Sequence, residues 1–271
     1  MTSEGEQLLS DCRGLLNHAA AIDERAQGLK RGDTGTLKVA ASPQHIESVL
    51  SQFLHRYAQR YPNVQVKLIE APGLEIRAML ERGEVHLGQN LLNASPTSDE
   101  RFGSQPLEYV DILAACHVRL QLGREGKVNI EDLASYPLLL MDTQFAVRGS
   151  FDAACRLAGL KPNILLESRT PHTLLALAEA GHGVAIIPSQ LQSHRYQLRV
   201  VGVTYRGRPV REPMMIWWDK RRPQPRYAMA FCKMLAEHVR EVFPISRPSE
   251  LKTNAKVKRA TARRAREYGT V

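Results

Sequence analysis

The chain has 271 residues, of which 43% are hydrophobic and 24% are charged, as in folded proteins with one large core or two smaller ones. No apolar run approaches the roughly 20 residues that a membrane-spanning helix needs, and no secretory signal opens the chain. We therefore expect a cytoplasmic protein with no membrane partner.

The first predicted element is a helix over residues 1–32. Ser3 and Glu6 have the spacing of an N-terminal capping box, and Gly32 ends the pattern. Apolar side chains repeat along this helix with heptad spacing: Leu8, Cys12, Leu15, Ala19, Ile22, Ala26 and Leu29. Such a narrow seam suits a partner helix, so we predict a dimerisation helix. The alternative is a helix packed against its own domain.

Strand and helix patterns alternate after this helix. Strands are expected at residues 36–41, 64–69, 85–89, 107–116, 138–141, 164–167, 184–187 and 213–218. Helices are expected at residues 43–61, 75–82, 148–158, 173–180 and 225–242, and a loop at 93–105. Repeated strand–helix–strand units predict parallel sheets covered by helices, and two α/β lobes fit this length better than one sheet.

Ligands of such folds bind where strands end and the next helices begin. The segments in these places contain hydroxyl, amide and imidazole groups, and the candidate ligand-binding residues are Ser42, Pro43, Gln44, Thr143, Gln144, Thr170 and His172. Free backbone N–H groups and helix dipoles would favour a small anionic ligand such as a carboxylate. The alternative is that these residues only cap their helices.

The end of the chain, 246–271, is strongly basic. Residues 251–271 carry seven Lys or Arg side chains and one Glu, which accounts for six of the nine net positive charges. We expect a disordered tail that makes weak, non-specific contact with nucleic-acid phosphates; a solvated tail without function is an equal alternative.

Known catalytic motifs are missing from the sequence. It contains no GxSxG, no HExxH and no phosphate loop, and the glycines at 181 and 183 precede a strand instead of following one. The four cysteines are scattered without a CxxC pair, and the nine histidines have no metal-ligand spacing. His172 could serve as a general base by type, but a ligand hydrogen bond or a helix start is the simpler role. We expect no enzyme, no metal and no cofactor.

Five motifs in one order resemble the LysR-type transcriptional regulators. They are TSEGEQLL at 2–9, GTLKVA at 35–40, FLHRYAQRYPNV at 53–64, LASYPL at 133–138 and EAGHGVAIIP at 179–188. The resemblance implies two Rossmann-like lobes of periplasmic-binding-protein-like (type 2) α/β architecture after a linker helix. Lobe 1 would comprise 36–110 and 212–245, and lobe 2 would comprise 111–211.

The same resemblance implies a small-molecule effector, or co-inducer, of unknown identity, bound between the lobes. Its contacts carry over to Ser42, Pro43, Gln44, Thr143, Gln144 and Thr170. The chain would form a homodimer or homotetramer on DNA. The family's winged helix-turn-helix precedes the linker helix, and no such segment stands before residue 2, so we expect specific DNA recognition to lie outside this sequence.

The sequence departs from the family pattern at the strand near residue 87. His86 replaces a usual Asp, and Gln89 and Asn90 put amides where apolar residues are common. Two rivals share the two-lobed architecture: a transporter's solute-binding protein, which predicts an exported monomer, and a cytosolic transferase, which predicts turnover. Sedimentation separates the first rival from the regulator.

Overall fold

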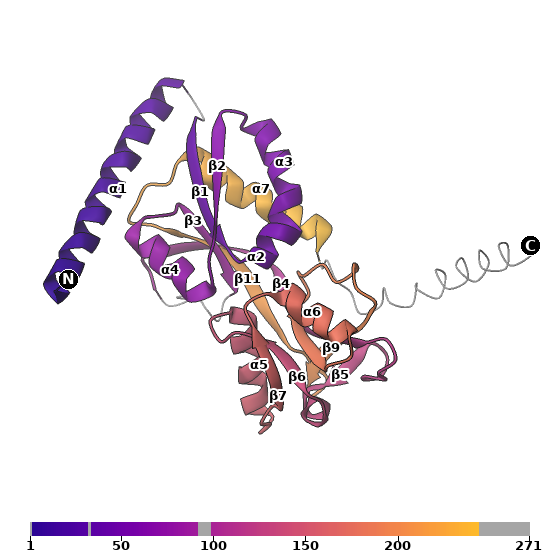
Figure 1. The fold of residues 1–271 in the computed structure, drawn as a ribbon. Coiled ribbons are helices and arrows are strands. Elements are labelled where there is room, and N and C mark those ends of the chain that lie inside the picture. Colours follow the sequence, from indigo (N-terminus) through magenta and orange to yellow (C-terminus); the bar gives the residue numbers. More distant parts are fainter. Residues whose placement is uncertain (1, 32–33, 92–98, 244–271) are drawn as a thin grey trace, which may run out of the picture.

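The computed structural model describes residues 2–31, 34–91 and 99–243; the predicted basic tail at 246–271 therefore lies outside the described residues. A long helix, α1 (Ser3–Arg31), precedes two α/β lobes (Figure 1). None of the helices in the described part of the chain combines the length and apolar character needed to cross a bilayer.

Lobe 1 is built on a sheet in the order β2–β1–β3–β11–β4. Its strands are β1 (Gly35–Ala41), β2 (Val64–Glu70), β3 (Leu87–Leu91), β11 (Arg211–Asp219) and the first part of β4 (Phe102–His117). Its helices are α2 (Pro43–His45), η1 (Ile46–Leu50), α3 (Ser51–Arg60), α4 (Gly73–Arg82) and α7 (Arg226–Val242). The first three form one continuous helix with a π turn in its middle.

Lobe 2 continues the same hydrogen-bonded path through β4–β8–β6–β7. Its other strands are β5 (Lys127–Asn129), β6 (Leu138–Met141), β7 (Ile164–Ser168), β8 (Val184–Pro188), β9 (Leu198–Tyr205) and β10 (Arg208–Pro209). Its helices are η3 (Ile130–Ser135), α5 (Ala146–Leu157) and α6 (Pro171–Glu179). Because β6, β7 and β8 are parallel, their carboxyl ends all lie at the same edge of the sheet.

Strand β4 belongs to both lobes. It pairs with β11 up to Asp111, and from Ile112 onward it pairs with β8 and β9. The chain crosses a second time through β9, β10 and β11. These two strand connections join the lobes, so relative motion of the lobes must bend the backbone there.

Each lobe has its own hydrophobic core. In lobe 1, α3 and α7 cover one face of the sheet, where the Phe53 and Phe231 rings meet edge to face at 4.9 Å. The Tyr57 hydroxyl donates to the Tyr227 carbonyl at 3.0 Å, which satisfies the polar end of a buried ring. Helix α4 covers the opposite face, and α5 and α6 pack on the lobe 2 sheet.

Three local predictions need correction. The loop expected over 93–105 is wrong for residues 102–105, which open strand β4 although Gly103 and Pro106 are poor strand formers. Pairing with β11 overrides that preference. Strand β3 runs two residues later than expected, so Gln89 and Asn90 lie inside a buried strand. Strand β9, which lies between β4 and β5, was not expected.

Candidate functional site

The candidate residues of lobe 1 lie where β1 passes into the helix that starts at α2. Ser42 is the N-cap: its hydroxyl accepts from the His45 backbone N–H at 3.4 Å, and Pro43 occupies the first helical position. Gln44 is buried, whereas Ser42 and Pro43 are partly exposed. The strand end and the helix start therefore fix these residues at the carboxyl edge of the lobe 1 sheet.

The candidate residues of lobe 2 lie in two neighbouring turns. Thr143 and Gln144 follow β6, in a turn that is held because the Asp142 carboxylate accepts from the Gln144 N–H at 2.9 Å. Thr170 follows β7 and is the N-cap residue of α6. Because β6 and β7 are parallel neighbours, and Asp142 N–H donates to the Ser168 carbonyl at 3.0 Å, the two turns lie side by side.

One predicted residue directly links the two lobes. His172, the second residue of α6, bonds through Nε2 to the Glu47 carboxylate of η1 at 2.8 Å. The other ring nitrogen, Nδ1, lies 3.2 Å from the Tyr196 hydroxyl, and the two rings stack with their centroids 6.0 Å apart. Glu47 and His172 are 125 residues apart in sequence and belong to different lobes.

A second set of polar side chains at this boundary is buried without hydrogen-bond partners among the described residues. It comprises both ring nitrogens of His45, the Ser48 hydroxyl and the Gln190 side-chain oxygen. His45 and Ser48 come from the helix after β1, and Gln190 follows β8 in lobe 2. Each such unpaired group costs about 1–3 kcal/mol when no ligand or water satisfies it. Native proteins keep few of these groups, and they concentrate at functional sites.

The charge state of His45 follows from its burial. Burial lowers the pKa of His45 from 6.5 to about 3, and the neighbouring Gln190 side chain acts in the opposite direction. Gln190 is thus close to the ring, although neither ring nitrogen completes a well-formed hydrogen bond. At neutral pH His45 is therefore an uncharged imidazole with one donor and one acceptor nitrogen.

The unusual amides of β3 lie next to this region. Ala40 of β1 pairs with Gly88 of β3, so Asn90 lies level with Ser42 at the end of the neighbouring strand. The Asn90 side-chain oxygen accepts from the Leu91 N–H at 2.8 Å, while its NH₂ group and the Gln89 oxygen are buried without partners among the described residues. The amide groups at this strand end therefore find only some of their hydrogen-bond partners among the described residues.

The remaining reactive side chains do not form a catalytic or metal site in the described part of the chain. No group of three His, Cys, Asp or Glu residues there could hold a metal ion. Burial raises the thiol pKa of Cys116 and Cys155 to about 11 and that of Cys232 to about 12, which keeps these thiols protonated and unreactive. Cys12 is exposed on α1.

Several residues at the boundary were not among the predicted site residues: His45, Glu47, Ser48, Gln190 and Tyr196. The strand-end rule could have found Gln190, which follows strand β8 directly, and His45, which stands in the segment after β1. Glu47, Ser48 and Tyr196 follow no strand end and show no pattern, so only the folded chain brings them to the boundary.

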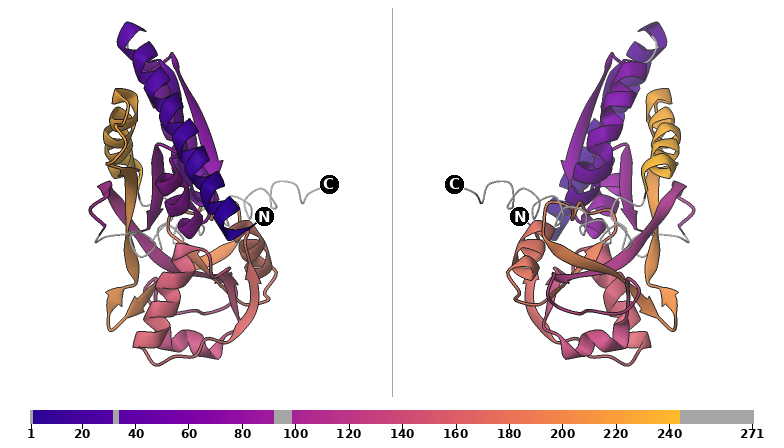
Figure 2. Two further views of the ribbon diagram at one scale, coloured as in Figure 1. Left: turned by 90° about the vertical axis from the view of Figure 1, so that its left-hand side faces the viewer. Right: turned by 90° about the vertical axis from the view of Figure 1, so that its right-hand side faces the viewer.

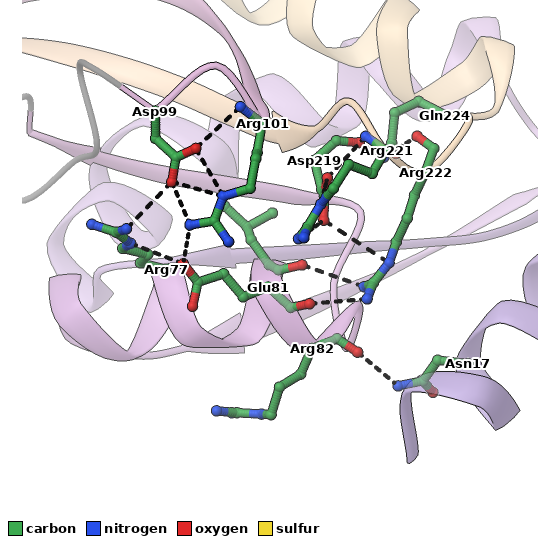
Figure 3. A network of polar contacts seen from close by, with 11 residues as sticks. Asn17, Arg77, Glu81, Arg82, Asp99, Arg101, Asp219, Arg221, Arg222 and Gln224 are labelled. Carbon is green, nitrogen blue, oxygen red and sulfur yellow. Dashed lines mark hydrogen bonds and ion pairs between the residues drawn. The ribbon is translucent and has the colours of Figure 1, made fainter. Parts of the chain in front are cut away.

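Helix α1 contacts lobe 1 at the end of α4 (Figures 2 and 3). The Asn17 side chain donates to the Arg82 carbonyl at 3.3 Å. Arg222 donates to the Glu81 carbonyl at 2.9 Å and to the Leu80 carbonyl at 3.4 Å. The Gly83 N–H also donates to the Leu80 carbonyl at 3.0 Å, and Asn17 and Arg222 complete the capping of the C-terminus of α4. Glycine is favoured at position 83 because its φ of 68° lies in the left-handed region, which residues with a Cβ atom rarely adopt.

The predicted pairing seam of α1 stays open in the isolated chain. Leu8, Leu15 and Ile22 are 64%, 74% and 53% exposed, and Cys12 and Ala19 are also exposed. Beside them Leu9 and Leu16 are exposed as well and widen the apolar stripe, which the heptad pattern alone did not indicate. The side chains of Ala26 and Leu29 lie outside the described residues. Among the described side chains, α1 thus contacts lobe 1 through the polar group of Asn17 and leaves Leu8, Leu9, Leu15 and Leu16 exposed.

Comparison with known proteins identifies the family. A family model described as the LysR substrate binding domain matches residues 30–240. The chain is 28% identical over 231 residues to the HTH-type transcriptional regulator IlvR of Caulobacter vibrioides, a match that covers 80% of this chain and 73% of IlvR. The chain belongs to the LysR substrate-binding-domain family, whose members are effector-binding parts of transcription regulators and not enzymes.

A second relative and a solved structure are also similar to the chain. It is 24% identical over 189 residues to the HTH-type transcriptional regulator CysB of Haemophilus influenzae, a match that covers 70% of the chain but only 58% of CysB. The fold matches the effector binding domain of QuiR in complex with shikimate with a TM-score of 0.68, at 11% identity, over 78% of this chain and 99% of that one. At this identity the structural match shows a common fold of two periplasmic-binding-protein-like lobes.

Proposed function

We propose that this chain senses a small metabolite bound between its two lobes and passes the signal to a DNA-binding segment through α1. The observation that carries the proposal is the group of buried, unpartnered polar atoms of His45, Ser48 and Gln190 at the lobe boundary. A ligand with matching hydrogen-bond groups would satisfy these atoms and so favour the arrangement of the lobes in which it is bound.

The ligand is proposed to bridge the turns of the two lobes. Ser42 and Gln44 would contact it from lobe 1, and Thr143 and Thr170 from lobe 2, with Pro43, Gln144 and His172 completing the site. The candidate side chains include no Lys or Arg, so an anionic ligand would be held by backbone N–H groups and by the N-termini of the helix after β1, of α5 and of α6. The effector binding domain of QuiR, which has this fold and is in complex with shikimate, supports the proposal of a small-molecule site.

The experiment is a thermal-shift screen of a metabolite library, followed by calorimetry on each hit. Ser42→Ala combined with Thr170→Ala should leave folding intact and weaken binding by about 1–3 kcal/mol for each hydrogen bond lost. Ser104→Ala with Ser135→Ala, at exposed positions of β4 and η3 outside the proposed site, is the matched control. Unchanged affinity in the double variant would remove these residues from the site.

We also propose that copies of the chain pair through α1 into a homodimer or homotetramer in the cytoplasm, and that DNA is bound through a winged helix-turn-helix joined to α1. The apolar stripe of exposed Leu8, Leu15 and Ile22 supports the pairing. The names of IlvR and CysB, both HTH-type transcriptional regulators, support the DNA-binding role. No cofactor is proposed besides the effector.

Sedimentation tests the pairing. Leu8→Glu with Leu15→Glu should lower the assembled mass, because two buried like charges would replace apolar contacts in the seam. Gln7→Glu with His18→Glu adds the same acidic side chains at exposed positions outside the seam and should leave the mass unchanged. An unchanged mass after removal of residues 1–31 would exclude pairing through this helix.

A further inference from the structure

We infer that Glu47, His172 and Tyr196 form a latch that holds the two lobes together in the absence of effector. The inference rests on the proposed function, because it concerns how the same boundary between the lobes is regulated. Its starting point is the 2.8 Å contact between the Glu47 carboxylate of lobe 1 and His172 Nε2 of lobe 2.

The three groups match one another as hydrogen-bond donors and acceptors. A carboxylate only accepts hydrogen bonds, so His172 Nε2 carries the ring proton that faces Glu47. The Tyr196 hydroxyl lies 3.2 Å from His172 Nδ1 and donates to the His172 backbone carbonyl at 3.5 Å. Stacking of the Tyr196 ring fixes the orientation of the imidazole. Tyr196 thus holds the His172 ring of lobe 2 in an orientation in which its Nε2–H group faces the Glu47 carboxylate of lobe 1, even when the histidine is uncharged.

The local backbone brings Glu47 to this position. It lies in η1, the π turn of the helix that continues from α2 into α3. Such turns widen the helix and redirect its side chains, and they occur often at functional sites. Glu47 is next to Ser48 and two residues from His45, while His172 is two residues from Thr170. The latch therefore lies directly beside the proposed effector site.

The exposure of the pair is consistent with reversible opening. The side chains of Glu47 and His172 are 36% and 31% exposed, so water replaces either partner when the contact breaks. Exposed pairs of this kind stabilise weakly, and we expect the latch to favour the closed arrangement by only about two- to fivefold. That range suits a switch, since a ligand can readily shift an equilibrium that is nearly balanced.

The test measures the separation of the lobes in the full-length chain without ligand. Cys12→Ser removes the exposed native thiol, and Ala58→Cys on α3 with Ala176→Cys on α6 gives exposed labelling sites on the two lobes. Labelled chains are mixed with excess unlabelled Cys12→Ser chains, so that distances between copies do not contribute. Double electron–electron resonance spectroscopy then gives the distribution of distances between the two spin labels.

Glu47→Ala and His172→Ala should each shift this distribution toward longer distances, and the double variant should shift it no further, because either change breaks the same contact. Tyr196→Phe should give a smaller shift in the same direction. Glu75→Ala and His182→Ala, at exposed positions of α4 and of the turn after α6, are the controls and should leave the distribution unchanged.

Distributions that match the controls, or additive effects of the two single variants, would overturn the latch. The Glu47→Gln variant keeps a side-chain oxygen that can accept from Nε2 and should lie between wild type and Glu47→Ala. The metabolite screen decides the proposed function separately: with no hit in the screen but coupled shifts in the variants, the latch would stand and the proposed sensing role would fall.

Discussion

Two pairs of side chains join the same lobes in opposite ways. The inner pair, His45 and Gln190, is buried, and the two ring nitrogens of His45 and the side-chain oxygen of Gln190 lack well-formed hydrogen bonds among the described residues. The outer pair, Glu47 and His172, is about one third exposed and fully hydrogen-bonded. Only one residue separates His45 from Glu47, yet one pair leaves polar atoms unsatisfied and the other satisfies its own.

Under the proposed function, the two pairs would respond differently to a ligand. Buried polar atoms without partners destabilise a protein, so the inner pair would gain from an effector that binds them. The outer pair gains nothing, because each of its groups already has a partner or water. Together the two pairs would allow the lobes to close without effector and would make the closed arrangement more favourable when effector is bound. Three predictions test this contrast.

The largest expected effect is the loss of stability in acid caused by His45. The folded protein keeps His45 neutral, with a pKa of about 3, whereas the unfolded chain takes up a proton below its ordinary value of 6.5. Because the unfolded state binds more protons in this window, acid favours unfolding, by about 1.4 kcal/mol for each pH unit below 6.5. Urea unfolding across this range should show a shallower dependence on pH in His45→Leu than in wild type.

This comparison has an internal control. Burial also lowers the pKa of His86, to about 4, but that histidine and all carboxyl groups remain in both proteins and contribute equally. Parallel curves for wild type and His45→Leu would mean that His45 binds its proton equally well in the folded and unfolded states, and the burial of the inner pair would then not affect its charge.

The second effect is the stability of the same variant at neutral pH. His45→Leu removes two unpaired buried nitrogens and keeps a side chain of similar size, so the free energy of unfolding should stay level or rise by about 1 kcal/mol. Phe53→Leu, in the core on the same helix, should lower it by about 1–2 kcal/mol. A loss of more than about 1 kcal/mol in His45→Leu would indicate that the ring has native partners.

The smallest effect concerns the outer pair. Glu47→Ala should lower the free energy of unfolding by about 0.2–1 kcal/mol, because a partly exposed hydrogen-bonded pair stabilises the fold only weakly. Glu75→Ala, also on an exposed helix of lobe 1, provides the reference for replacing a helical glutamate. An effect above about 2 kcal/mol would place Glu47 among the buried contacts.

Local patterns predicted much of the fold because its strands and helices have clear periods and clear ends. Ser42 and Thr170 were found since each lies between a strand and a helix, where N-cap residues and ligands both occur. Strand β9 could have been predicted from its Val, Thr and Tyr residues, since Leu198–Tyr205 reads LRVVGVTY. The early start of β4 was missed because its pairing partner, β11, lies far away in the chain. Cross-strand pairing outweighs the weak local preferences there.

The amino-acid order alone determined the α/β lobes, the long first helix and the strand-end turns, because hydrophobic period and capping residues act over a few neighbours. Only the tertiary structure decided that Glu47 meets His172, that Gln190 approaches His45, and that Asn17 caps α4. These contacts join residues between 65 and 145 positions apart in the chain, as the printed sequence shows. No local pattern encodes such distances, because they depend on how whole lobes and helices pack.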